Sequence, residues 1–172
     1  RHDAGVLCHR GDRGGVISAQ IHLTQFDDRE ALQAAVAALP DDVARVALDL
    51  PLRANLSAVD NIALIPLYQR HYNAAESTRQ AQTMLEQLGH AEIALLRDPD
   101  MTPAQRFVTK LARALILRRP RLVIDRPGAM LYDVPYPGFI RQLAEQAMMG
   151  GTWEVFDFSW NQALYNQALN SE

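Results

Sequence analysis

The sequence predicts an α/β fold built around a parallel sheet. An amphipathic helix that begins near Thr102 is followed by Pro120 and then by a short apolar strand that ends in Asp125. A helix that leads directly into a buried strand with an acidic residue at its carboxyl end is typical of parallel α/β sheets. Further apolar strands are expected over 43–50 and 153–158. With 172 residues, the chain is long enough for one compact domain or for one core with a subdomain.

The first fifty residues are expected to form a strand, a helix and a second strand. The apolar run over 16–23 predicts the first strand. Asp27 or Asp28 then caps a helix over about 29–39, whose alanines favour close packing. A Pro-Asp-Asp turn follows, and the apolar run over 43–50 predicts a second, buried strand.

A glycine-rich segment, RGDRGG at 10–15, is the candidate for a phosphate-binding loop. Such a loop needs Gly-Lys-Ser/Thr, because backbone amides and the lysine hold the phosphates while the hydroxyl holds Mg²⁺. The chain has 16 arginines but one lysine, Lys110, which is predicted to lie on a later helix. We therefore interpret 10–15 as a turn before a strand. The single cysteine, Cys8, excludes an internal disulfide and has no zinc-binding spacing around it.

The middle of the chain is predicted to be helical. The pattern begins at Ser57, and we expect a break near Pro66. A second helix is expected over 74–88 and ends at Gly89, because glycine accepts the left-handed conformation that terminates many helices.

The helix that follows carries the strongest local signals. Thr102 provides an N-cap, Pro103 stands at the first helical position, and Gln105 completes a capping box. The basic pair at 118–119 suits the last turn of the helix, which Pro120 ends. One face of the helix is apolar and is predicted to enter the core. The other face carries Arg106, Lys110 and Arg113.

The last third of the chain is predicted to alternate between strands and helices. The expected elements are a strand over 122–124, a turn bracketed by Pro135 and Pro137, a helix over 139–147, a strand over 153–158 and a short terminal helix over 161–171.

Composition excludes several classes of function. With 48% hydrophobic and 22% charged residues the chain is typical of globular proteins, and its net charge of −3 gives no reason to expect a nucleic-acid partner. No apolar run approaches the roughly 20 residues of a membrane span, and the first residues lack a signal-peptide core. We expect a soluble, cytoplasmic protein that is at most peripheral to the inner membrane, without direct membrane insertion.

Several segments together resemble a known family. The central helix opens with MTPAQ at 101–105 and continues with ARAL at 112–115, and the next strand ends in Asp125-Arg126-Pro127. This order resembles the nucleotide-binding domain of ABC (ATP-binding cassette) transporters, in which the signature LSGGQ opens such a helix and Asp-Glu-Pro ends the strand. Three further segments are similar to the family in the same order, LSAVDNIAL at 56–64, MLEQLG at 84–89 and the strand and turn at 152–163.

The resemblance implies an architecture. It predicts a truncated, P-loop-NTPase-like parallel sheet core with a helical subdomain. Residues 1–51 would form the N-terminal part of the α/β core without a P-loop, 52–105 the helical subdomain, and 106–172 the C-terminal part of the core.

The signature is changed at the positions that matter chemically. Its degenerate remnant is Thr102, Pro103, Ala104 and Gln105. In the family, glycines at this helix start let backbone amides approach the terminal phosphate of ATP. Here Pro103 has no amide proton and Ala104 adds a side chain, so part of the anion site is lost.

The other catalytic positions are changed as well. In the degenerate Walker B remnant, Asp125 is retained but Arg126 replaces the general-base glutamate, and a guanidinium cannot accept a proton from water. Phe158 stands at the switch position where the family has a phosphate-sensing histidine, and there is no glutamine between Gln33 and Gln69. We expect no catalytic residue, no metal site and no cofactor, with ATP and Mg²⁺ bound only if the resemblance is functional. Asp125 paired with Arg126 is the simpler expectation.

These changes predict a pseudo-ATPase, a non-hydrolytic ABC-ATPase-like subunit or domain of a transporter system that acts through protein–protein contacts. The segment at 56–68 resembles cassettes associated with lipid transport, and this resemblance implies lipid-type transport. In the family, a groove beside the helical subdomain receives a short helix of the membrane permease. A membrane permease or a sister ATPase subunit is the expected partner, and dimerisation is left open. The candidate partner-binding residues are Leu52, Leu56, Ile65, Leu67 and Tyr68.

Two alternatives stay open. The chain is either an N-terminally incomplete ABC ATPase that needs a partner chain for nucleotide binding and hydrolysis, or a free-standing α/β interaction domain whose likeness to the family is accidental.

Overall fold

The structure, a computed structural model, describes residues 2–6 and 20–169 of the 172-residue chain. The glycine-rich segment at 10–15, Cys8 and the first part of the strand expected over 16–23 lie outside the described residues.

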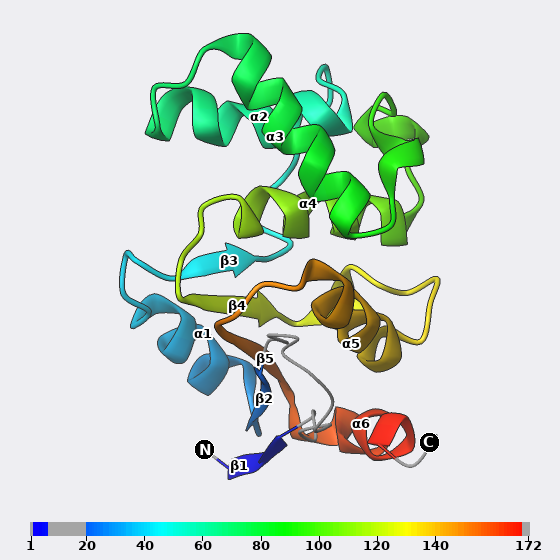
Figure 1. The fold of residues 1–172 in the computed structure, drawn as a ribbon. Coiled ribbons are helices and arrows are strands. Elements are labelled where there is room, and N and C mark those ends of the chain that lie inside the picture. The colour runs from blue at the N-terminus through cyan, green and yellow to red at the C-terminus, as the bar shows by residue number, and fades with distance from the viewer. Residues whose placement is uncertain (1, 7–19, 170–172) are drawn as a thin grey trace, which may run out of the picture.

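The described strands form one sheet in the order β1-β2-β5-β4-β3 (Figure 1). Four strands run parallel, namely β2 (Gln20–Phe26), β5 (Thr152–Phe158), β4 (Arg121–Asp125) and β3 (Ala44–Val46). Strand β1 (His2–Val6) pairs antiparallel with β2 at the edge. The predicted α/β class with a parallel, P-loop-NTPase-like sheet is confirmed.

Two strands differ from their predicted ranges. Strand β2 continues to Phe26 because all seven of its residues pair with β5. The strand predicted over 43–50 is shorter, since β3 ends at Val46 and residues 47–50 form a turn closed by a hydrogen bond from Leu50 N to Ala47 O (3.3 Å). The following Pro51 has no amide with which to extend a ladder.

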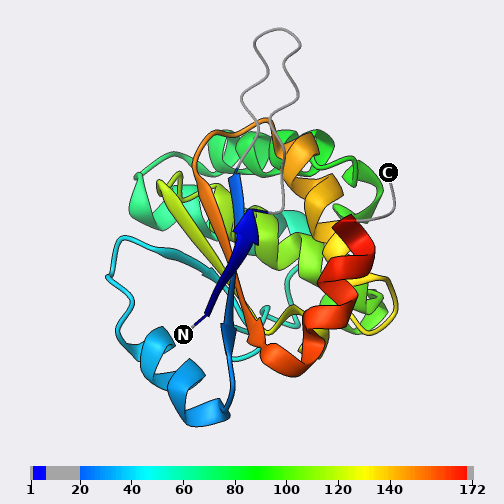
Figure 2. The same cartoon turned by 90° about the horizontal axis from the view of Figure 1, so that it is seen from below.

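Helices cover both faces of the sheet (Figure 2). Helix α1 (Arg29–Ala37), capped by Asp28, packs Leu32 against Phe26, Val123 and Phe156 on one face. The alternate residues of β4 and β5 face the other way, as the two-residue period of a strand requires. They join the larger core, which includes residues of α2, α3, α4 and α5.

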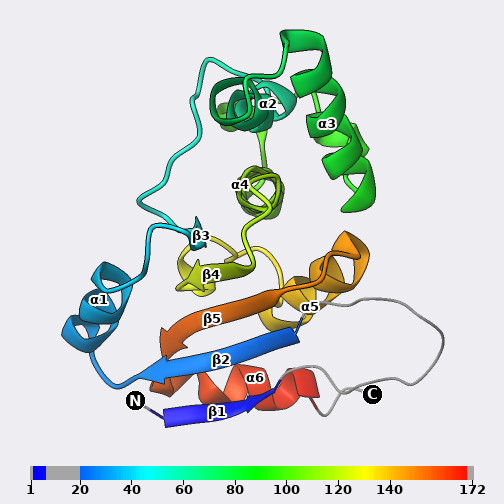
Figure 3. The same ribbon diagram turned by 60° about the vertical axis from the view of Figure 1, so that its left-hand side comes forward.

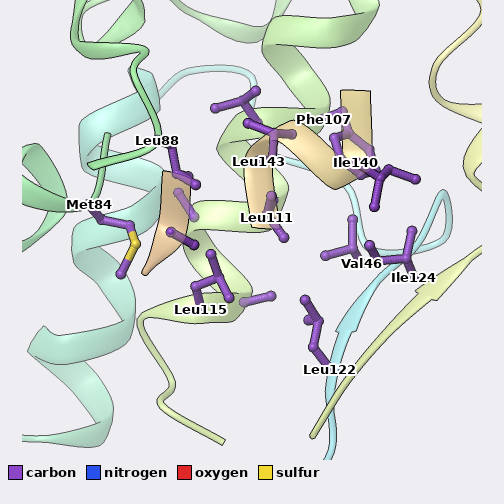
Figure 4. Close-up of a cluster of buried hydrophobic side chains, with 14 of the residues drawn as sticks. Val46, Met84, Leu88, Phe107, Leu111, Leu115, Leu122, Ile124, Ile140 and Leu143 are labelled. Atoms are coloured by element: carbon purple, nitrogen blue, oxygen red, sulfur yellow. The ribbon is translucent and has the colours of Figure 1, made fainter. Parts of the chain in front are cut away.

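Helix α4 (Pro103–Leu115) lies between the sheet and the helices α2 (Ala58–Gln69) and α3 (Ala74–Gln87), as Figure 3 shows. Its predicted capping box is confirmed, because Thr102 and Gln105 each accept a hydrogen bond from the other's backbone amide. Leu111 stands in the middle of the large core cluster (Figure 4). Layers on both sides of α4 leave little of it exposed.

The sequence places Lys110 on the face of α4 opposite its apolar face, yet the structure buries this residue. The chain between β3 and α2 folds against this flank of α4, and the Lys110 ammonium donates to the backbone carbonyl of Ala47 (2.8 Å). The helix also ends at Leu115, earlier than Pro120 predicts, and Arg118 adopts a left-handed conformation (φ 53°) before the chain enters β4.

The prolines do not break helices where the sequence predicts. Helix α2 continues through Pro66, whose buried ring lies within one turn of the helix end. Pro135 and Pro137 do not bracket a turn, since they form the start of α5 (Tyr136–Ala147). Proline suits a first turn because the amides there have no intrahelical partner. The chain ends with α6 (Gln162–Leu169) within the described residues.

Short 3₁₀ turns connect several of these elements. They span Ala91–Ile93, Asp98–Asp100, Pro127–Ala129 and Ser159–Asn161. Over the described ranges, no helix is both long and apolar enough to cross a lipid bilayer.

Candidate functional site

The carboxyl end of β4 holds an ion pair between adjacent residues. Arg126 donates from Nε to Asp125 Oδ1 (2.8 Å) and from Nη2 to Asp125 Oδ2 (3.0 Å). Asp125 is 2% exposed, and a guanidinium nitrogen of Arg45 lies 3.9 Å from its Oδ2. The pairing of Asp125 with Arg126 is therefore as the sequence predicts.

Backbone geometry sets up this pair. Arg126 adopts a left-handed conformation (φ 48°, ψ 65°), which costs on the order of 1 kcal/mol for a residue other than glycine. Its amide donates to Phe156 O on β5 (2.8 Å), so the bend is anchored to the sheet. The hydrogen bond with Asp125 raises the pKa of the Arg126 guanidinium, and the side chain is a cation at any usable pH.

These residues do not fit a magnesium ion. Mg²⁺ binds through carboxylate oxygens in near-octahedral geometry, and both Asp125 oxygens already accept hydrogen bonds from one guanidinium. Elsewhere in the described chain, no group of three or more His, Cys, Asp or Glu side chains could hold a metal ion. A cation is present at the end of β4, but the chain itself supplies it.

The start of α4 does not fit an incoming phosphate. The amide of Thr102 donates to the Gln105 side chain (2.9 Å), and that of Gln105 donates to Thr102 (3.2 Å). Pro103 has no amide hydrogen, and the Ala104 amide donates to Asp133 Oδ2 (3.2 Å). Asp133 thus places a carboxylate where an anion would bind at the helix N-terminus. Sequence reasoning missed Asp133, which lies 29 residues from Ala104 and follows no motif.

The connection from β2 to α1 is a third position where a charged side chain of the protein stands in the place of a ligand. A P-loop joins a strand to a helix whose N-terminal amides hold phosphate. Here the connection consists of Asp27 and Asp28, and Asp28 Oδ1 already accepts from the Ala31 amide (2.8 Å). Two carboxylates at this helix start disfavour a polyphosphate. The cap at Asp28 could be predicted from the sequence, but the parallel pairing of β2 with β5 that precedes it could not.

Phe158 lies at the end of β5, beside the strand that carries Asp125. Its ring stacks on the exposed indole of Trp160 (centroids 4.2 Å apart, planes at 13°). A phenyl ring neither donates nor accepts a proton, so this position offers no phosphate-sensing group.

Asp157, which precedes Phe158 on β5, is buried and fully hydrogen-bonded. Its carboxylate accepts from Tyr136 Oη (3.0 Å), Tyr165 Oη (2.7 Å), Asn161 Nδ2 (2.9 Å) and the Phe158 amide (2.8 Å). Burial, together with the neighbouring charge of Asp157, raises the pKa of both tyrosine hydroxyls. The phenols stay neutral donors, and the cluster joins α5 and α6 to β5.

Comparison with solved structures supports the resemblance at the level of fold. The chain is similar to the ATP-binding cassette MJ0796, solved as a dimer in a post-hydrolysis state bound to ADP and Pi. The TM-score is 0.53 and the identity 22%, over 74% of this chain and 61% of that one. The chain has an ABC-like fold. It spans about three-fifths of the length of MJ0796, and no family model matches it.

On this ABC-like fold, a groove of about 610 Å³ lies between α2, α4 and the chain after β3. We call it the α2–α4 groove. Its shape depends on Asn61, which accepts a hydrogen bond from Arg53 N (2.8 Å) and donates to Arg53 O (3.1 Å). The residues that line it are Val43, Arg45, Leu50, Pro51, Arg53, Asn61, Leu64, Ile65, Tyr68, Gln69, Arg113, Ala114 and Leu117.

The groove receives two of the five predicted partner-binding residues. Ile65 and Tyr68 line it, and Tyr68 is 71% exposed. Leu52 is buried in the core, which makes it unavailable as a contact. Leu56 and Leu67 are half-buried and do not line the groove.

The walls of the groove are cationic. Arg45, Arg53 and Arg113 line it, and none of its lining residues is acidic. Arg113 is anchored by hydrogen bonds to Leu50 O (2.8 Å) and Pro51 O (2.9 Å), and burial lowers its pKa. The Nε of Arg45 is buried and makes no hydrogen bond within the described residues. Three arginines and no carboxylate among the lining residues suit a partner that brings carboxylates.

Proposed function

We propose that the chain is a non-hydrolytic, ABC-ATPase-like subunit or domain that acts by binding a protein partner. The observation that carries this proposal is the α2–α4 groove, because it combines the exposed ring of Tyr68, three arginines and a volume large enough for several side chains. In this proposal residues 52–105 act as the helical subdomain.

Three positions support the non-hydrolytic part of the proposal. Where a cassette would hold magnesium and phosphate, this chain has Arg126 on Asp125, Asp133 on the Ala104 amide and Asp28 on the Ala31 amide. At each position the side chain has the same sign of charge as the ligand that would bind there. Arg126 is positive, like Mg²⁺, and Asp133 and Asp28 are negative, like phosphate. No cofactor is proposed for the same reason.

The groove also indicates the chemistry of the partner. An amphipathic helix with apolar residues on one side and carboxylates beside them would match Ile65, Tyr68 and the three arginines. We propose a membrane permease or a sister ATPase subunit as the source of this helix. The likeness of residues 56–68 to cassettes of lipid transport makes lipid-type transport the first system to test.

We expect Ile65→Asp and Tyr68→Asp to abolish co-purification with a co-expressed membrane permease or sister ATPase subunit. Each change places a charge in the apolar part of the groove, and burying an unpaired carboxylate at an interface costs several kcal/mol. The melting temperature of Tyr68→Asp should stay within about 2 °C of the parent, because Tyr68 is 71% exposed. Ile65→Asp should also lower the melting temperature, because Ile65 is half-buried and packs against the core, so Tyr68→Asp is the cleaner test.

Tyr132→Asp is the matched control, since Tyr132 is 75% exposed but lies outside the groove. It should leave partner capture unchanged. Capture that survives both groove changes would favour a free-standing interaction domain without this docking surface.

Millimolar Mg-ATP should leave the melting temperature unchanged. A ligand at 100 times its dissociation constant stabilises a fold by about 2.7 kcal/mol, which corresponds to roughly 5–10 °C for a chain of this size. Differential scanning fluorimetry measures this shift, with magnesium chloride and sodium tripolyphosphate as separate controls. A reproducible rise with Mg-ATP but not with the controls would instead support an incomplete ATPase that binds nucleotide.

A further inference from the structure

Lys110 is the only lysine of the chain, and it is buried. The residue is 5% exposed, and Nζ donates one hydrogen bond, to Ala47 O (2.8 Å). No carboxylate within the described residues approaches the ammonium closely enough to form an ion pair. A buried lysine without a carboxylate partner is unusual, because an isolated charge is costly to bury.

A cavity of about 120 Å³ opens beside this lysine. Pro103, Phe107 and Lys110 of α4 form one side of it, and Leu48, Met130 and Tyr132 form the other. It has room for about four water molecules, since each occupies about 30 Å³ in the liquid.

The cavity also has the position expected of a ligand site. Leu48 follows the carboxyl end of β3, and Met130 and Tyr132 follow that of β4, the neighbouring strand. In open α/β sheets, ligands bind outside the carboxyl ends of the strands.

The surroundings of Lys110 lower the pKa of its ammonium group. Burial is the largest cause that lowers its pKa, and the positive charge of Arg113 comes next. Asp98 and Asp49 oppose the shift, whereas Arg106 adds to it. Desolvation and a neighbouring cation are the two conditions that activate lysine as a nucleophile, because a larger fraction of the amine is then unprotonated near neutral pH.

We propose that Lys110 is a nucleophilic amine that condenses with a small, uncharged aldehyde or ketone in this cavity. The Nζ lone pair attacks the carbonyl carbon, the C–N bond forms as the C=O π bond breaks, and a proton passes from Nζ to the carbonyl oxygen to give a carbinolamine. Loss of water then breaks the C–O bond and leaves a C=N double bond to Nζ, with no net redox change. Arg106, which lies in the cavity wall, is already paired with Asp98 (2.7 Å), so the site favours an uncharged compound over a keto acid.

Reductive trapping tests the proposal on the full chain. The protein is incubated with propionaldehyde and sodium cyanoborohydride, which reduces the imine to a stable amine, and peptide mass mapping then locates the added propyl group. The Arg119→Lys variant supplies an exposed lysine in the same molecule as an internal reference. At pH 7 we expect Lys110 to react several times faster than the introduced lysine, and the advantage should vanish at alkaline pH, where both amines are neutral.

Two further arms separate a built site from ordinary amine reactivity. A bulky aldehyde such as 1-naphthaldehyde should label the introduced lysine in preference to Lys110, because it exceeds the cavity. Lys110→Arg should lose the internal adduct and keep the one at the introduced lysine. A Lys110 that stays unmodified by propionaldehyde at pH 7, or that reacts more slowly than the exposed reference, overturns the proposal, and mapping the parent chain gives this result even if Lys110→Arg does not fold.

Discussion

Replacing Asp157 with alanine lowers the free energy of unfolding by about 3–5 kcal/mol. The carboxylate is 1% exposed and accepts hydrogen bonds from Tyr136, Tyr165, Asn161 and the Phe158 amide. Removing it strands two phenol donors in the core, where each unsatisfied donor costs about 1–3 kcal/mol, and leaves a small cavity as well. The loss should be greatest in the packing of α5 and α6 on β5.

Urea unfolding followed by circular dichroism measures this change. Asp27→Ala is the matched control, because Asp27 follows the end of the neighbouring strand β2 and its side chain is exposed. The control should stay within about 0.5 kcal/mol of the parent. If Asp157→Ala were equally mild, the tyrosine hydroxyls would have another acceptor, and the cluster would not join these helices to the sheet.

Gly151→Ala lowers the free energy of unfolding by about 3 kcal/mol. Gly151 connects α5 to β5 with a φ of 125°, a region that other residues rarely adopt, and an added Cβ would lie 2.9 Å from Pro120 O. That carbonyl cannot move away freely, because it accepts the hydrogen bond from the Thr152 amide that begins β5 (3.1 Å). Backbone strain and steric overlap therefore act together.

Gly138→Ala has the opposite expected sign and serves as the control. Gly138 lies in the first turn of α5, and nothing lies within 4 Å of the position its Cβ would take. Alanine is a better helix former than glycine, so the change should stabilise the fold by about 0.5–1 kcal/mol. Equal effects at the two glycines would show that the close approach between Gly151 and Pro120 does not constrain the chain.

Features that depend on neighbouring residues could be predicted from the sequence. The capping box at Thr102 and Gln105 and the cap at Asp28 involve residues three positions apart, so their geometry follows from the start of a helix alone. The pair of Asp125 with Arg126 joins adjacent residues at the end of a strand. The predictions based on proline were wrong, because α2 continues through Pro66 and α5 begins at the prolines that were expected to bracket a turn.

The candidate sites depend on contacts between residues that are far apart in the chain. The α2–α4 groove combines residues from Val43 to Leu117, and only Ile65 and Tyr68 among its members were predicted. The amide of Ala104 receives Asp133 because the chain after β4 folds back over the start of α4. Neither contact has a periodic or local signal.

The sequence by itself determined the alternation of strands and helices and the helix starts, because both depend on residue type and short spacing. Only the tertiary structure decided which charges are buried and what accompanies them. Lys110 has the spacing of a surface residue, yet α4 lies between two layers, and the chain after β3 covers its flank. Burial and long-range pairing depend on how the layers pack. The pattern of residues along one helix does not show which other segments of the chain pack against it.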